Sequence, residues 1–91
     1  MSPTVRVVKT SDVLHGEPRL EGTRIGVLQV GELVRKRGVE PENVADQLDL
    51  DTAQVRAATD YYDEHPELME TLRAQKEARQ RSVAAQSRAP E

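Results

Sequence analysis

The stretch PENVADQLDLDTAQVRAATD, residues 41–60, decides the fold of this 91-residue chain. Pro41 suits the first turn of a helix, and apolar side chains then recur at helical spacing as far as Leu48. Asp51 is a typical N-cap for a second helix that begins at Thr52. Because the connection between the two helices is so short, they must cross at a large angle. The pattern predicts a helix-turn-helix.

A helix-turn-helix needs apolar residues that lock its crossing helices and a small residue where the helices approach most closely. Ala45 is the small residue in this chain. The apolar positions are Val44, Leu48, Leu50, Val55 and Ala58. With Val55, Ala58 and Tyr62 turned inward, the start of the second helix must present its other face outward. The predicted DNA-reading residues on that face are Thr52, Ala53, Arg56 and Ala57.

The charge of this segment argues against DNA binding by the segment alone. Residues 41–60 contain five acids and one base, Arg56, whereas phosphate neutralisation supplies much of the affinity of proteins for DNA. The net charge is +3 over residues 1–38, −7 over residues 39–65 and +1 over residues 66–91. Phosphate contacts are therefore predicted in the basic front. The candidates are Arg35, Lys36 and Arg37, then Arg19 and Arg24, then Arg6 and Lys9.

Each of these interpretations has a structural alternative. Any compact three-helix protein makes a similar corner between two helices, so residues 41–60 need not contact DNA. Residues 35–37 lie in the last turn of a predicted helix, where cations complement the helix dipole and keep the helix end solvated. Both alternatives stay open from the sequence.

The front of the chain predicts a short β element followed by a helix. Residues 5–9 are rich in valine and indicate a strand, and residues 16–27 contain too much glycine and proline for a helix. A tight turn at Gly22, with positive φ, is expected to join two very short extended pieces. The spacing of apolar residues then predicts a helix from Val27 to about Arg37. Gly38 is expected to end it in the left-handed conformation.

The C-terminal part of the chain predicts a weakly anchored helix. Pro66 interrupts the preceding helix, and a new helical pattern runs over residues 66–81 with apolar residues only near its start. Residues 82–91 are predicted to be a disordered tail. The expected organisation is thus a mainly α domain over residues 1–65, with an N-terminal β-strand or hairpin element, and a C-terminal helical segment.

Composition excludes several classes of protein. The chain has no cysteine, tryptophan or phenylalanine, so its core must be small, and a homodimer is the expected state. It has no apolar run long enough for a membrane span and no signal-peptide pattern, which predicts a cytoplasmic protein without a membrane partner. We expect no enzyme activity, cofactor, metal or small-molecule substrate, because no nucleophile–base pair or metal-ligand cluster is recognisable.

The motif Gly22-Thr23-Arg24-Ile25 has two interpretations. In the functional one, Arg24 and the hydroxyl of Thr23 contact phosphate. In the structural one, the motif is a fixed turn in which Arg24 satisfies nearby carbonyls and Ile25 enters the core. The glycines favour the structural interpretation, because they are a sufficient reason for a fixed turn.

The sequence from Gly16 to Tyr62 resembles the VapB-like antitoxin family, also called domain of unknown function 433. The resemblance lies in a motif of eight fixed positions in twelve. These are Gly16, Pro18, Leu20, Gly22, Thr23, Arg24, Ile25 and Val27. Weaker matches follow at the family's spacing: Gly38, Pro41-Glu42-x-Val44, Leu50, Val55-x-x-Ala58 and Tyr61-Tyr62. The chain departs from the family at Leu48, where proline is usual, and at Asp51, where threonine or serine is common.

The resemblance implies a helix-turn-helix antitoxin of a type II toxin–antitoxin module, which binds operator DNA and regulates transcription. Its partner would be a PIN-like ribonuclease toxin, neutralised by the C-terminal segment. In that hypothesis Leu68, Met69 and Leu72 are anchors. One of the cations of the segment, Arg73, Lys76, Arg79 or Arg81, reaches acidic metal-binding residues of the nuclease. One alternative is a terminal helix packed on the dimer. The other is a protein-interaction module that sequesters a partner without binding DNA.

Overall fold

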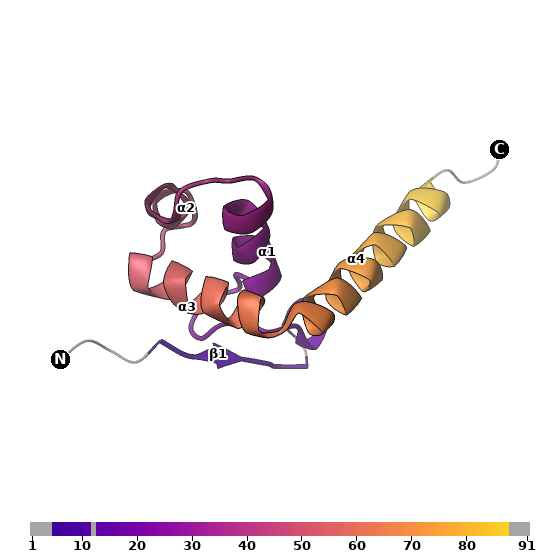
Figure 1. Ribbon diagram of the computed structural model, residues 1–91. Helices are drawn as coiled ribbons and strands as arrows, with labels where there is room; N and C mark the ends of the chain where they lie inside the picture. The colour runs from indigo at the N-terminus through magenta and orange to yellow at the C-terminus, as the bar shows by residue number, and fades with distance from the viewer. Residues whose placement is uncertain (1–4, 12, 88–91) are drawn as a thin grey trace.

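The computed structural model describes residues 5–11 and 13–87 and is mainly helical. Figure 1 shows a group of three helices above a short strand, with a long fourth helix projecting to one side. In chain order the elements are β1 (Val7–Val8), η1 (Leu14–Gly16), β2 (Arg19–Leu20), α1 (Val27–Gly31), η2 (Glu32–Lys36), α2 (Pro41–Leu48), α3 (Thr52–Glu64) and α4 (Pro66–Ser87). Among the described residues, no helix is long and apolar enough to cross a membrane.

The predicted β element is present at the N-terminus. β1 and β2 are antiparallel, with Val7 opposite Leu20 and Val8 opposite Arg19. The chain then turns at Gly22, whose φ of 81° confirms the predicted positive φ. On the return, the amide of Leu20 donates to the carbonyl of Ile25 at 3.0 Å, so β2 has backbone bonds on both of its edges.

The helix predicted from Val27 to Arg37 forms in two parts. α1 ends at Gly31, and η2 continues it as a π-helical segment, in which the amide of Arg37 donates to the carbonyl of Glu32 at 3.0 Å. Gly38 follows with a φ of 69°, which confirms the predicted left-handed helix end.

The two crossing helices and their short connection agree with the sequence prediction. α2 begins at Pro41 and ends at Leu48. The next residue, Asp49, caps the helix with a φ of 56°, in the left-handed region that aspartate tolerates. Asp51 is the N-cap of α3, and its amide donates to Oε1 of Gln54 at 2.8 Å in a capping box. These local bonds fix where α3 begins and therefore which of its residues face outward.

The core lies where α1, α2 and α3 meet over the β element. Its buried hydrophobic residues are Leu20, Val27, Leu28, Val30, Val44, Ala45, Val55, Ala58, Met69 and Leu72. α1 lies against α3 at Gly31, where an added Cβ would lie 2.8 Å from Cβ of Tyr62. Thr59 is buried on α3, and its hydroxyl donates to the carbonyl of Arg56 at 2.9 Å.

α4 differs from its prediction in length and in attachment. It runs to Ser87 rather than to about Arg81, so residues 82–87 are helical and not a disordered tail. Residues 88–91 lie outside the described residues. Farther along the helix, Nη2 of Arg79 donates to Oε2 of Glu17 at 2.9 Å, which ties α4 to the N-terminal segment. Met69 and Leu72 in its first turns are buried in the core, so these turns belong to the globular part, and the rest of the helix forms the projecting rod in Figure 1.

Candidate nucleic-acid interface

The outward face of α3 is where the sequence predicts it. Thr52, Ala53 and Arg56 are exposed, and Ala57 is half-buried, while Val55 and Ala58 on the opposite face are fully buried. The guanidinium of Arg56 makes no hydrogen bond or ion pair with any residue that the structure describes. The first two turns of α3 thus present a narrow surface with one available cation.

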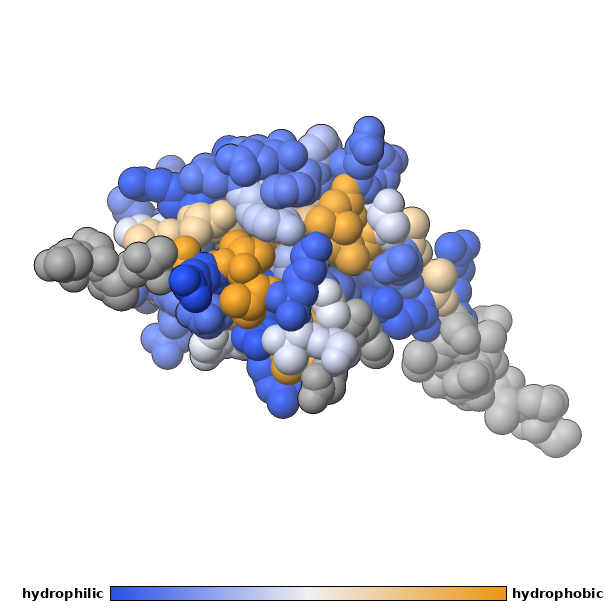
Figure 2. All heavy atoms as spheres, turned by 90° about the horizontal axis from the view of Figure 1, so that it is seen from below, coloured by the Kyte–Doolittle hydropathy of each residue, from blue (hydrophilic) through white to orange (hydrophobic). Residues whose placement is uncertain are grey.

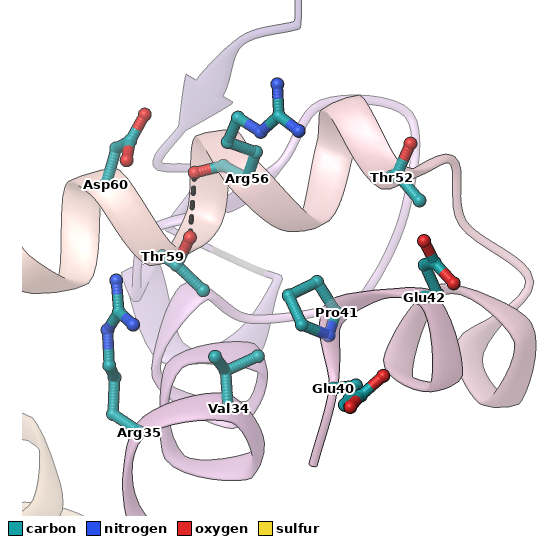
Figure 3. A pocket seen from close by; sticks show the side chains of 9 residues that line it. All are labelled: Val34, Arg35, Glu40, Pro41, Glu42, Thr52, Arg56, Thr59 and Asp60. Atoms are coloured by element: carbon teal, nitrogen blue, oxygen red, sulfur yellow. Dashed lines mark hydrogen bonds between the residues drawn. The ribbon is translucent and has the colours of Figure 1, made fainter. Parts of the chain in front are cut away.

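A groove of about 410 Å³ lies beside this face (Figure 3). It is lined by Val34, Arg35, Glu40, Pro41, Glu42, Thr52, Arg56, Thr59 and Asp60. In Figure 3, Thr52 of α3 and Glu42 of α2 lie at one end of the groove, and Arg35 and Asp60 lie at the other. Acidic side chains therefore flank the predicted DNA-reading residues on the α2 side.

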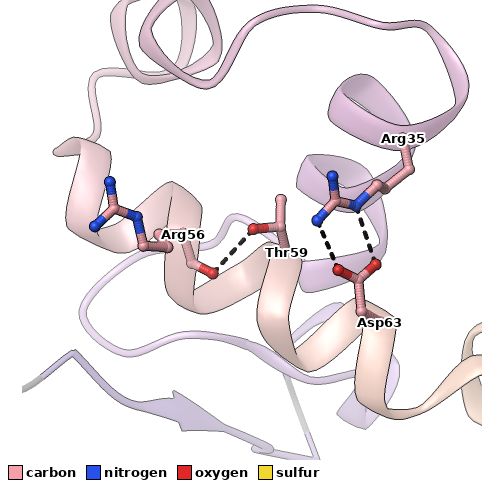
Figure 4. A network of polar contacts seen from close by, with 4 residues as sticks. All are labelled: Arg35, Arg56, Thr59 and Asp63. Atoms are coloured by element: carbon pink, nitrogen blue, oxygen red, sulfur yellow. Dashed lines mark hydrogen bonds and ion pairs between the residues drawn. The ribbon is translucent and has the colours of Figure 1, made fainter.

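Arg35 is bound within the protein. Its Nε and Nη2 donate to the two carboxylate oxygens of Asp63 on α3, at 3.0 and 2.6 Å (Figure 4). This hydrogen-bonded ion pair raises the pKa of Arg35 and lowers that of Asp63. Both side chains are about half exposed, so water screens the pair and its effect on stability is small. The pair matters more for the surface charge, because Asp63 neutralises the guanidinium of Arg35, which the sequence predicts to contact phosphate.

Of the other predicted phosphate contacts, Arg19 is half-buried and bonded within the chain, whereas Lys36, Arg37 and Arg24 are available. Lys36 and Arg37 are exposed at the end of η2, and Arg24 is exposed in the turn that follows β2. None of these three side chains has a hydrogen bond or ion pair to the part of the chain described here. Together with Arg56, they are cations that a phosphate backbone would have to engage.

The Gly22-Thr23-Arg24-Ile25 motif forms a fixed turn, as its structural interpretation predicts, but a different arginine stabilises it. Nη1 of Arg19 donates to the carbonyl of Thr23, and its Nη2 donates to Oγ1 of Thr10, each at 2.9 Å. The hydroxyl of Thr23 donates to the carbonyl of Leu20 at 2.8 Å and accepts from the amide of Ile25. The expectation that Arg24 satisfies the carbonyls is therefore wrong, since Arg19 has that role.

The predicted partner-binding residues of α4 are largely used within the chain. Met69 and Leu72 are 1% and 8% exposed and belong to the core, and Leu68 is half-buried against it. The first turns of α4 therefore cover the globular part of this chain, and the role of these three residues as anchors for a partner stays a prediction. Of the four predicted cations, Lys76 and Arg81 are exposed, whereas Arg73 and Arg79 are bonded within the chain.

Arg73 joins α4 to α3 and η2. Its Nε donates to Oε2 of Glu32 at 2.9 Å, and its Nη2 donates to the hydroxyl of Tyr62 at 3.1 Å. The bond to Glu32 is the main cause of the raised pKa of Arg73. The guanidinium of Arg73, predicted to bind carboxylates of a partner, thus binds the carboxylate of Glu32 in its own chain.

Two ion pairs near the site are not predicted from the sequence. The contact of Asp63 with Arg35 spans 28 positions, and that of Glu32 with Arg73 spans 41. The only signal in the sequence is opposite charge on neighbouring helices, which many other pairs share. Among the described residues, no group of three histidine, aspartate or glutamate side chains is placed to hold a metal ion.

The fold and surface define a small, mainly helical protein with an antiparallel strand pair, an exposed start of α3 and a projecting C-terminal helix. Residues 7–62 match the family described as "Protein of unknown function (DUF433)". The match covers more than half of the chain, and the protein belongs to this family. Searches of curated proteins and of solved structures found no match.

Proposed function

We propose that this protein is a DNA-binding antitoxin of a type II toxin–antitoxin module that acts in the cytoplasm as a homodimer. In this proposal α2 and α3 act as a helix-turn-helix, and the first turns of α3 enter the major groove of operator DNA. The partner is a PIN-like ribonuclease, bound through α4. No catalytic role is assigned to any residue.

The observation that carries the proposal is the exposed face formed by Thr52, Ala53 and Arg56 at the start of α3. The helix behind this face is rigid, because Val55 and Ala58 are fully buried and a capping box fixes its first turn. A short polar side chain and an arginine on a rigid helix start suit contacts with base edges. Lys36, Arg37 and Arg24 supply sequence-independent contacts with phosphates.

In the proposal, the partner-binding surface lies farther along α4 than the sequence predicts. Met69 and Leu72 are unavailable, since they are buried in the core. Residues 74–78 are exposed on the projecting part of the helix, and Lys76 lies among them. In the proposal, this exposed rod is the surface on which a toxin docks.

Replacing Arg56 by alanine tests base contact, and replacing Lys36 by alanine tests phosphate contact. Arg56→Ala should weaken binding to the DNA upstream of the gene by about 5- to 150-fold, with most of the loss traced to one base position. Lys36→Ala should weaken binding to all DNA sequences alike and lower the slope of log affinity against log salt by about one. Fluorescence anisotropy over a salt series measures both effects.

The matched control for this experiment is Gln80→Ala, which alters an exposed residue on α4 far from α3 along the chain. Binding should be unchanged. The proposal is contradicted if the wild-type protein gives no salt-sensitive mobility shift on its upstream DNA, either alone or together with the product of the neighbouring gene.

Asp63→Asn should strengthen DNA binding. The substitution removes one negative charge near α3 and releases the Arg35 guanidinium from its bidentate partner. We expect an affinity gain of about 3- to 10-fold in low salt that shrinks as salt screens the added charge. Glu64→Gln is the control, because it removes an equal charge from an exposed carboxylate without an ion-pair partner among the described residues. Equal gains for both variants would show that Arg35 contributes nothing specific.

A second candidate function is supported by the acids around the groove. Glu40, Glu42 and Asp60 line the same groove as Thr52 and Arg56, and their charge opposes the approach of a phosphate backbone. In this alternative, the protein sequesters a basic protein partner and does not bind DNA. Capture of the neighbouring gene product without any DNA shift would favour it.

A further inference from the structure

The outer edge of β1 is a row of unused backbone hydrogen-bonding groups. The amide of Glu21 donates to the carbonyl of Arg6 at 2.9 Å, and Val8 lies opposite Arg19 in the ladder. In an antiparallel pair, alternate residues direct their backbone groups toward the same neighbour. Arg6 and Val8 therefore face β2, whereas the backbone groups of residues 5, 7 and 9 face away from it.

Nothing in the described part of the chain covers that edge. β1 has a single partner strand, β2, and no backbone hydrogen bond of the described residues involves the groups of residues 5, 7 and 9 on their open side. Val5, Val7 and Val8 are only half-buried. Figure 2 shows hydrophobic side chains gathered on the underside of the molecule, the side along which β1 runs in Figure 1. An exposed edge of this kind is a template for another strand.

The edge is complementary to itself. If two copies pair antiparallel about a two-fold axis at Val7, each Val7 exchanges both of its backbone bonds with the Val7 of the other copy. Residue 5 of one copy then pairs with residue 9 of the other. A shift by one residue is excluded, because residues 6 and 8 already use their backbone groups on β2.

The side chains fit this register on both faces of the sheet. On the core face, Ile25, Leu20 and Val7 form an apolar row that continues into the same three residues of the second copy. On the core face, Lys9 of one copy also lies opposite Val5 of the other. On the opposite face, Arg6 of one copy lies opposite Val8 of the other. No two cations are directly opposed, and Glu21 lies opposite Arg6 within each copy. If the pairing register shifted by two residues so that the two-fold axis passed through Arg6, Arg6 of one copy would lie directly opposite Arg6 of the other, and the two positive charges would repel each other.

We propose that the homodimer forms by antiparallel pairing of β1 with β1 of a second copy about a two-fold axis at Val7. The proposal rests on the homodimer of the proposed function and assigns its interface. Because the edge is only about five residues long, a dissociation constant in the range of about 1–100 µM is expected. Two Arg6 and two Lys9 side chains approach the axis, so added salt should tighten the dimer, whereas it weakens DNA binding.

Val7→Pro tests the interface, since proline removes the amide donor that the monomer does not use. Proline is tolerated on edge strands whose amide faces solvent, so circular dichroism should show a folded variant. Light scattering at about 200 µM should give an average mass of about 1.6 to 2 times the 10.2 kDa of the chain for the wild type over this range of dissociation constants, and the monomer mass for Val7→Pro. Val7→Ala is the matched control, because it shortens the side chain and keeps the amide; it should stay dimeric.

Amide hydrogen exchange on the wild-type protein provides an independent measurement if Val7→Pro does not fold. The amides of Val7 and Lys9 should become protected as the protein concentration rises. A dimer that survives Val7→Pro, or protection of these amides that does not depend on concentration, would overturn the interface and leave the proposed dimer standing. A wild-type monomer at 200 µM would overturn both the interface and the dimer, while the DNA mobility shift still decides the DNA-binding function.

Discussion

Gly31→Ala is expected to lower the free energy of unfolding by about 2 kcal/mol, although alanine is the better helix former by about 1 kcal/mol. The added Cβ would lie 2.8 Å from Cβ of Tyr62 and closer still to the ring atoms Cγ and Cδ2. Tyr62 cannot rotate away cheaply, because its hydroxyl accepts a hydrogen bond from Arg73. Urea unfolding followed by circular dichroism measures the loss, and the melting temperature should fall by about 10 °C.

Two controls separate steric overlap from backbone strain. Gly38→Ala adds a Cβ with nothing within 4 Å, but at a φ of 69°, so it should cost only about 1 kcal/mol. In a Tyr62→Gly background, which removes Cβ as well as the ring, Gly31→Ala should lose its penalty and become neutral or stabilising. If Gly31→Ala raised the stability of the wild-type protein, α1 and α3 would not approach each other as closely as described.

Local chemistry made much of the fold predictable. The left-handed residue at Gly38 and the N-cap at Asp51 each act through bonds to residues a few positions away, and such signals are visible in a sequence. The outward face of α3 followed from them, because fixing the first residue of a helix fixes which positions point inward. These features place Thr52, Ala53 and Arg56 on the exposed face of α3 from the sequence alone.

The remaining features depend on pairings between distant residues. Whether Arg19 or Arg24 bonds the turn is decided by the register of β1 against β2, and whether Arg35 is available is decided by Asp63 of another helix. The sequence does contain a local signal for the full length of α4. Alanine and glutamine recur through residues 74–86, and their helix propensity outweighs the missing apolar face.

Met69→Ala is expected to destabilise the whole domain by about 2–5 kcal/mol, as is typical for truncation of a buried methionine. Met69 is 1% exposed, and it lies in the first turn of α4, where the amide of Met69 donates to the carbonyl of His65 at 3.0 Å. The truncation therefore leaves a cavity between α4 and the core. Thermal unfolding of the globular part should show one cooperative transition at a lower temperature, because the first turns of α4 belong to its core.

The comparison with Lys76→Ala distinguishes a core residue from a docking residue. Lys76 is exposed on the same helix, two to three turns beyond Pro66, and its truncation should change stability by no more than about 0.5 kcal/mol. If α4 docks on a toxin through its projecting part, Lys76→Ala should weaken capture of the toxin at unchanged stability. The opposite result, in which Met69→Ala abolishes capture and leaves the unfolding transition unchanged, would restore Met69 as an anchor. It would also mean that the first turns of α4 leave the core when a partner binds.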